Sequence, residues 1–476
     1  MPVAHRRAST AGIETRRAGI TRPRASVLTT PDRRSYRVVL LTIAVIAAIC
    51  SAKVARAASL SYEDARNVLH SVSDLHKSGE AGVNRHEYEA RAADSLGLPE
   101  VSVQATQIYG QKTGSLATPL GSIGVNLNFN GPRSSVDSTW AIYTGGRITA
   151  TQRALAAGVD QAKAELASSD EHLDLELTEV YFGQELAANV ERTQREVLQA
   201  ADRHLERAKR FEQQGVIPKV ERLNAQVSRD EAERALVRAQ RDREIAQARL
   251  QRLLHRDTPI EVSTPLFVLN NALKPLSEWL QVAEHQNPIL GAFDARREQA
   301  QQSIVIADSR WKPEVFAFGS YAMIRHYQTL IEPNWVAGIG IRFTLFSRED
   351  RASGVSAARE GLRQVESLEA ETRNQIDSAV ETSYRKVEQA REQFNLLDST
   401  LTFTRENLRL RERGFEEGQA TSLDVNDARN ALARAETQRA AAAYDFVVAL
   451  AALLEASGQA HSLPEFVDKA DIKLRS

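Results

Sequence analysis

The amino-acid sequence predicts a mainly α-helical fold with a membrane β part, in which one order of elements occurs twice. Proline is absent from residues 133–217 and 334–463, and both stretches are rich in the strong helix formers Ala, Glu, Gln, Arg and Leu. A segment of alternating apolar and polar residues comes before each long helical region. Residues 98–101 (LPEV) return as 312–315 (KPEV), and 140–143 (WAIY) as 343–346 (FTLF), which indicates an old duplication.

Composition excludes several classes of protein. The chain has 476 residues, 42% of them hydrophobic and 26% charged, with a mean hydropathy of −0.37. These values exclude a polytopic helical membrane protein and a disordered chain. The net charge of −1 gives no excess of positive charge for a nucleic-acid partner, and a single cysteine excludes an intrachain disulfide or a paired-cysteine metal site.

Residues 1–57 have the three parts of a secretory signal peptide. They carry eleven basic and two acidic residues, a net charge of +9, which leaves −10 for residues 58–476. The apolar run 38–50 would span about 20 Å as a helix, too short for a bilayer core of about 30 Å. Cleavage is expected after Ala57. The length of the basic segment leaves open whether translation starts at Met1 or further downstream. Cys50 as a lipidation site is the less favoured reading, because Ile49 before it is too large for lipoprotein cleavage.

The β segments have the alternation of membrane strands. Strands are expected around residues 101–105, 139–143, 316–321 and 335–346. In the last of these, apolar residues (Ala337, Ile339, Ile341, Phe343 and Leu345) alternate with small or polar ones (Gly338, Gly340, Arg342 and Thr344). One such pair alone would suit a soluble sandwich equally well. Two pairs, each followed by a very long helical hairpin, favour a transmembrane β-barrel.

The helical regions have the pattern of coiled coils. Val159, Leu166, Leu173 and Val180 recur every seven residues, as do Val380 and Val387. A continuous helix over residues 147–213 would be roughly 100 Å long.

Each helical region breaks once, at a glycine. Gly215 precedes Pro218, and Gly418 precedes Thr421 and Ser422, either of which can cap a returning helix ahead of Asp424. Both halves therefore predict a helical hairpin. The expected boundaries are a leader (1–57), an N-terminal helical segment (58–97), first strands (98–146), first hairpin (147–255), a connecting helical segment (256–312), second strands (313–346), second hairpin (347–456) and a C-terminal tail (457–476).

The order of parts over residues 58–456 resembles the TolC-like outer membrane factors of bacterial efflux and type I secretion. The most specific pieces are the two tips, 215–225 (GVIPKVERLNA) and 418–428 (GQATSLDVNDA). The resemblance implies a homotrimer in which four strands from each protomer form a 12-stranded transmembrane β-barrel. Duplicated long hairpins would form a coiled-coil α-barrel across the periplasm. It also implies a Gram-negative outer membrane, contact with its lipid, a periplasmic adaptor (membrane fusion) protein and an inner-membrane transporter of RND, ABC or MFS type.

The resemblance also assigns site residues at the hairpin tips. Asp424 and Asp427 match acidic residues of the family's periplasmic constriction, and their spacing puts both on one helix face. Spacing alone favours a cap role for Asp424 and a solvated Asp427, whereas the tip match favours a pore ring for at least one of them. Phe415 and Glu221 match gate contacts, although Ala420 replaces a basic residue, which leaves the closing links open.

The glycine turns have a second role under the same resemblance. Gly215, Val216, Gly418 and Gln419 are expected to contact the adaptor, and the glycines serve equally as turn residues. The transported substrate and the partner pump are not determined by the sequence.

The sequence contains no recognised catalytic motif. Phosphate-binding loops, nucleophile elbows and zinc-protease motifs are missing, and the ten histidines are scattered. His70 and His76 lack ligand spacing, so the sequence predicts no catalytic residue, metal site or cofactor. The alternative to an outer-membrane exit channel is a structural coiled-coil protein of the bacterial envelope that forms no pore.

Overall fold

A computed structural model describes residues 59–325 and 333–474. The predicted leader and Cys50 lie outside the described residues. The described residues belong to one compact unit, Ala57–Ser476.

The duplication predicted from the sequence is confirmed element by element. In both halves a short helix and a longer helix lead into two strands and then into a very long hairpin. The longer arms have 67 and 66 residues, and both returning arms have 35. The first half comprises α2 (Tyr62–Val72), α3 (Asp74–Asp94), β2 (Glu100–Thr118), β3 (Gly121–Tyr143), α4 (Arg147–Gln213) and α5 (Lys219–Leu253). The second comprises α6 (Leu276–Gln286), α7 (Pro288–Ser309), β6 (Glu314–Arg325), β7 (Trp335–Arg342), α8 (Arg351–Glu416) and α9 (Ser422–Ala456).

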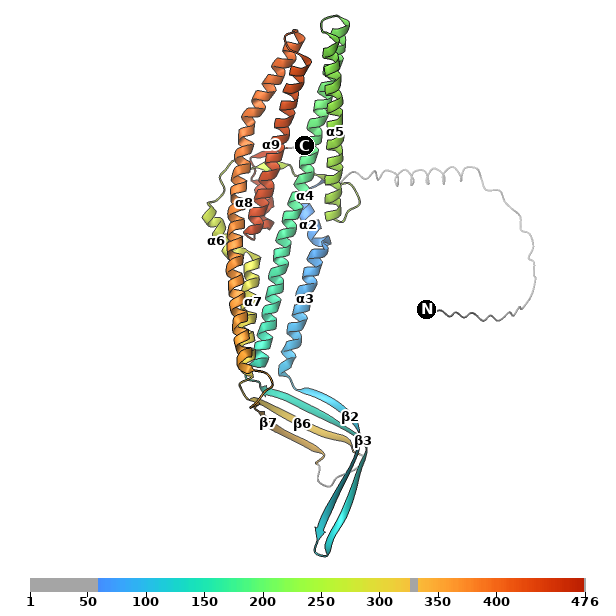
Figure 1. Cartoon of the computed structure of the whole chain (residues 1–476), viewed down its shortest axis with the longest axis vertical. Coiled ribbons are helices and arrows are strands. Elements are labelled where there is room, and N and C mark those ends of the chain that lie inside the picture. The colour runs from blue at the N-terminus through green and yellow to red at the C-terminus, as the bar shows by residue number, and fades with distance from the viewer. Residues whose placement is uncertain (1–58, 326–332, 475–476) are drawn as a thin grey trace, which may run out of the picture. The chain divides into compact units, whose positions relative to one another are not determined.

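The four long helices pack as a row. Figure 1 shows α4 beside α5 and α8 beside α9, and α4 also contacts α9. The outer members of the row are therefore α5 and α8. The shorter helix α3 packs along α4, and α7 packs between α4 and α8. Along the helices, Val380, Val387 and Leu173 of the predicted heptads are buried.

Both hairpins turn at a glycine with a left-handed backbone, as the sequence predicts. Gly215 and Gly418 each have φ of +74°. The residue after each glycine donates its amide to a carbonyl of the preceding helix, Val216 to Phe211 at 2.8 Å and Gln419 to Gly414 at 2.7 Å. This bond closes the helix end in the manner of a Schellman motif, which requires a residue that tolerates positive φ.

The four longer strands form one antiparallel sheet in the order β2-β3-β6-β7. The first strand pair runs well beyond the short segments expected at 101–105 and 139–143, with 19 and 23 residues. In the second pair, the expectation of a strand up to Phe346 is wrong, because β7 ends at Arg342. Arg342 pairs with Glu314, the first residue of β6. Pro313 before it has no N–H to continue the ladder.

Four shorter strands bring distant segments into the middle of the unit. β1 (Ser59–Leu60) pairs with β4 (Glu261–Val262), and β5 (Leu266–Val268) pairs with β8 (Ile472–Leu474). The sequence predicted neither pair. The C-terminal segment also contains η2 (Ala460–Ser462) and α10 (Leu463–Asp468), and η1 (Ser95–Gly97) follows α3.

The main core lies where these small sheets meet the long helices. Rings of Tyr62, Tyr181, Phe182, Phe267 and Phe446 pack against one another from α2, α4, β5 and α9. This core anchors the middle of both hairpins. In the described part of the chain, no helix combines the length and the hydropathy that crossing a membrane would require.

Candidate functional site

The two hairpin tips share a small apolar cluster of their own. Its buried members come from all four long helices: Leu205, Ala208, Ala225, Phe415 and Val425. Ala420, which stands where the resemblance expects a basic residue, is partly buried against this cluster. The two tips of one chain are therefore held together by packing as well as by polar contacts.

Phe415 is the aromatic centre of the tip cluster. Its side chain is 2% exposed. The ring centroid lies 4.6 Å from that of His204 and 6.0 Å from that of Phe211, and the two phenylalanine rings are nearly parallel. Both partners belong to α4, whereas Phe415 belongs to α8. Stacking joins the hairpins here without any hydroxyl group.

Glu221 joins the hairpins through a helix cap. Its carboxylate accepts a hydrogen bond from the backbone N–H of Ser422 at 2.7 Å. Ser422 is fully buried and is the first residue of α9, so its N–H has no acceptor within its own helix. A carboxylate from the first hairpin therefore accepts the free N–H at the start of a helix in the second. Its negative charge also stabilises the positive end of that helix dipole.

The same serine contacts a buried histidine. Nε2 of His204 lies 3.3 Å from the Ser422 hydroxyl. Burial, with Arg429 and Arg207 nearby, lowers the pKa of His204 to about 4, so the imidazole is neutral at neutral pH. Further links between the hairpins are the hydrogen bond of Asn426 to Ser228 and the ion pair of Arg207 with Glu416.

Asp424 acts as a helix cap in the single chain. Its carboxylate accepts from the backbone N–H and the hydroxyl of Thr421, and Thr421 in turn caps the N–H of Asp424. These bonds, together with Arg411 at 3.4 Å, lower the pKa of the Asp424 carboxyl. Asp427 lies one turn further along α9 and is exposed. A ring of carboxylates requires several copies of the chain, so the pore role of both residues stays a prediction.

The four residues expected to contact an adaptor are all exposed. Val216 presents an apolar side chain that is 58% exposed at the first tip. Sequence reasoning missed His204 and Ser228, and it named Ser422 only as a possible helix cap, not as a contact between the tips. A lone histidine among Leu205, Ala208 and Phe211 was the only available signal for His204, and it did not indicate the partner.

Comparison with known proteins gives the family. A sequence model described as "Outer membrane efflux protein" matches residues 69–255 and 279–459, which include both hairpins and all four strands of the main sheet. The chain belongs to the outer membrane efflux protein family. Its function is therefore efflux at the outer membrane, within a family of channel proteins rather than enzymes. No curated protein sequence matches the chain at a significant level.

Solved structures of outer membrane channels have the same fold. The Campylobacter jejuni CmeC channel is 14% identical, with a TM-score of 0.70 over 86% of this chain and 90% of that one. The Vibrio cholerae outer membrane protein VceC is 14% identical, with a TM-score of 0.69 over 84% and 96% of the two chains. The open state of the Neisseria gonorrhoeae MtrE channel is 18% identical, with a TM-score of 0.63 over 84% and 89%.

Proposed function

We propose that this protein is the trimeric exit duct of a tripartite efflux or type I secretion system. Three copies close a 12-stranded barrel in the outer membrane, and their hairpins form a tunnel through the periplasm. An inner-membrane transporter of RND, ABC or MFS type powers transport through an adaptor protein, and the duct itself is passive.

The observation that carries the proposal is the open four-stranded sheet. Within the described residues, β2 pairs only with β3 and β7 only with β6, so both outer strands have a free edge. Large apolar side chains on β7 are exposed in the single chain, with Ile339 and Ile341 more than 70% exposed. In lipid a free edge leaves backbone N–H and C=O groups without hydrogen bonds, and each such group costs several kcal/mol of free energy. Pairing β7 of one copy with β2 of the next removes every edge.

The hairpins support the same assembly independently. On α8, Leu396, Phe403 and Leu410 are spaced by seven residues, and all three are more than half exposed. On α5, Val220 and Val227 have the same spacing and similar exposure. These apolar stripes lie on the two outer helices of the row. A neighbouring copy that puts its α5 against α8 buries both stripes in coiled-coil packing.

The tips are the proposed gate and docking region. Glu221 and Phe415 hold the two tips of each protomer together, and Asp427, with Asp424 beside it, narrows the pore by a ring of three carboxylates per position. The adaptor contacts the exposed turn residues Gly215, Val216, Gly418 and Gln419.

Planar-bilayer recording of the purified protein tests the channel. We expect discrete conductance steps from the folded trimer. A folded trimer that conducts no ions would favour the alternative, a coiled-coil envelope protein without a pore. That alternative does not require a sheet with exposed apolar side chains.

The same recordings test the carboxylate ring. Asp427→Ala should weaken block by a divalent cation added from the tip side, because it removes three negative charges from the narrowest part of the pore. Asp424→Ala should weaken block as well, with an added loss of the α9 cap. Asp160→Ala, an exposed acid on α4, is the control. If block is the same in Asp427→Ala and in the control, Asp427 does not line the constriction.

A further inference from the structure

A polar cluster far from the tips joins three helices near the start of the described chain. His70 lies in the last turn of α2, and His76 lies in the first turn of α3. In one continuous helix, a spacing of six residues would put these side chains on different faces. The helix instead breaks at Ser73, whose hydroxyl caps α3 by accepting from the His76 N–H. The two rings then lie 5.5 Å apart, although their spacing along the chain is not that of metal ligands.

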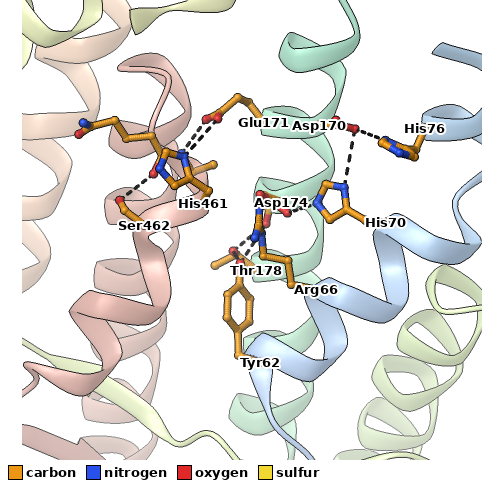
Figure 2. A network of polar contacts seen from close by, with 12 residues as sticks. Tyr62, Arg66, His70, His76, Asp170, Glu171, Asp174, Thr178, His461 and Ser462 are labelled. Carbon is orange, nitrogen blue, oxygen red and sulfur yellow. Dashed lines mark hydrogen bonds and ion pairs between the residues drawn. The ribbon is translucent and has the colours of Figure 1, made fainter. Parts of the chain in front are cut away.

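The two histidines converge on one carboxylate of α4 (Figure 2). Oδ1 of Asp170 lies 2.7 Å from Nδ1 of His76 and 3.8 Å from Nδ1 of His70. One ligand atom from each residue lies within 4.8 Å of the others. A tetrahedral zinc ion with bonds of about 2.0–2.1 Å needs ligand atoms about 3.3 Å apart. The two measured distances lie on either side of that value.

A second set of carboxylates is already in place around the imidazoles. The remaining nitrogen of His70, Nε2, lies 2.9 Å from Oδ1 of Asp174. The Asp174 side chain is 2% exposed, and its other oxygen accepts from Nε of Arg66 at 2.8 Å. The remaining nitrogen of His76 lies 3.6 Å from Glu80. Histidines that bind metals characteristically donate their second N–H to such a carboxylate, which fixes the ring orientation.

From this arrangement we infer that His70, His76 and Asp170 bind one divalent transition-metal ion of the Zn²⁺ type per chain. The ligands are Nδ1 of both imidazoles and a carboxylate oxygen, and water takes the fourth position. Two nitrogen donors favour zinc and its neighbours over Mg²⁺ or Ca²⁺, which prefer oxygen ligands. The three side chains are partly exposed, so the ion enters from solvent.

Such an ion would fasten the junction of α2 and α3 to α4. Buried apolar side chains are few at that junction, because Leu69 is the last buried apolar residue of α2 and the next buried apolar residue along α3 is Ala93. The ion therefore adds attachment where buried apolar side chains are few.

Calorimetric titration of the full-length purified protein, stripped of metal, with ZnCl₂ tests the site. We expect saturable binding of one ion per chain. His76→Gln and Asp170→Asn should each weaken binding at least tenfold, because each removes one of three ligands. His285→Gln, which changes an exposed histidine on α6, should bind as the unmodified protein does.

Two further measurements separate metal binding from folding. Circular dichroism and the oligomeric state show whether each variant is folded. Asp170→Asn is nearly isosteric, so it still tests the site if His76→Gln fails to fold. Zinc should also slow hydrogen exchange in peptides over residues 66–80 and leave the hairpin tips unchanged. Absence of saturable binding in the unmodified protein, or equal affinity in the folded variants, would overturn the assignment.

Discussion

Glu221 stabilises the start of a helix that belongs to the other hairpin. Its carboxylate lies 2.7 Å from the buried amide of Ser422. Local sequence rules could not reveal this contact, because the two residues are 201 positions apart. The same rules did narrow the helix cap to Thr421 or Ser422, since that signal lies within four residues, and the cap in the structure is Thr421. Within the candidate site, short-range roles were predictable and pairings across hairpins were not.

Removing this carboxylate should loosen the tips. In Glu221→Ala the Ser422 amide loses its charged acceptor inside a packed cluster, which costs about 1–3 kcal/mol. Hydrogen exchange in peptides covering 418–428 should rise by about fivefold to over a hundredfold, since 1.4 kcal/mol corresponds to tenfold. Glu221→Gln keeps an oxygen acceptor, so its exchange rate over 418–428 should lie between those of the unmodified protein and Glu221→Ala.

A matched control for this variant lies on the same helix. Glu231→Ala removes an exposed glutamate of α5. If exchange at 418–428 is the same in Glu221→Ala and Glu231→Ala, the contact does not hold the tips together.

At the scale of elements, helices were easier to predict than strands. The helix α4 begins at Arg147 and ends at Gln213, the range expected from composition and the glycine turn. Helical signals are local, because helix formers, caps and turn glycines act within one or two turns.

The long first strand pair lacks the signal used to find strands. One face of β2 and β3 has polar side chains that bond across the pair, Gln107 to Asn130 at 3.3 Å and Gln111 to Asn126 at 3.1 Å. Apolar alternation is weak there, so only the ends of these strands were expected. The cross-strand amide pairs contribute stability that a hydropathy pattern does not detect.

The second strand pair shows a related limit. Gly338 and Gly340 were expected to leave one face of β7 small. In the structure, rings from β6 cover both: a Cβ atom placed on Gly340 would lie 2.5 Å from the Phe316 ring, and one on Gly338 would lie 3.1 Å from that of Phe318. Alternation assigns residues of one strand to faces, whereas the filling of a face depends on cross-strand register.

The part of the chain that the structure describes has two matching incomplete sides. At the sheet end these are the free edges of β2 and β7, and along the hairpins they are α5 and α8. In each case one side comes from the first repeat and the other from the second. When the second repeat of one copy joins the first repeat of the next, a single rotation therefore pairs the free strand edges and also buries the outer helices against each other. A rotation that closes after three copies makes a ring with no remaining edge.

Cysteine crosslinking tests both the contact and the closure. Cys50, in the predicted leader, is the only cysteine, so Cys50→Ala gives a background without thiols. Val227 on α5 and Leu410 on α8, both exposed, are replaced by cysteine. Val227 lies eight residues from the tip end of α5 and Leu410 six residues from that of α8, so the two lie near the same level below the tips. The double variant should oxidise to covalent dimers and trimers, and to no larger species. In each single variant the cysteine on one helix faces a neighbouring helix that has no thiol. Each single variant should therefore run as a monomer in denaturing electrophoresis. A ladder extending beyond three chains would show open association instead of a closed duct.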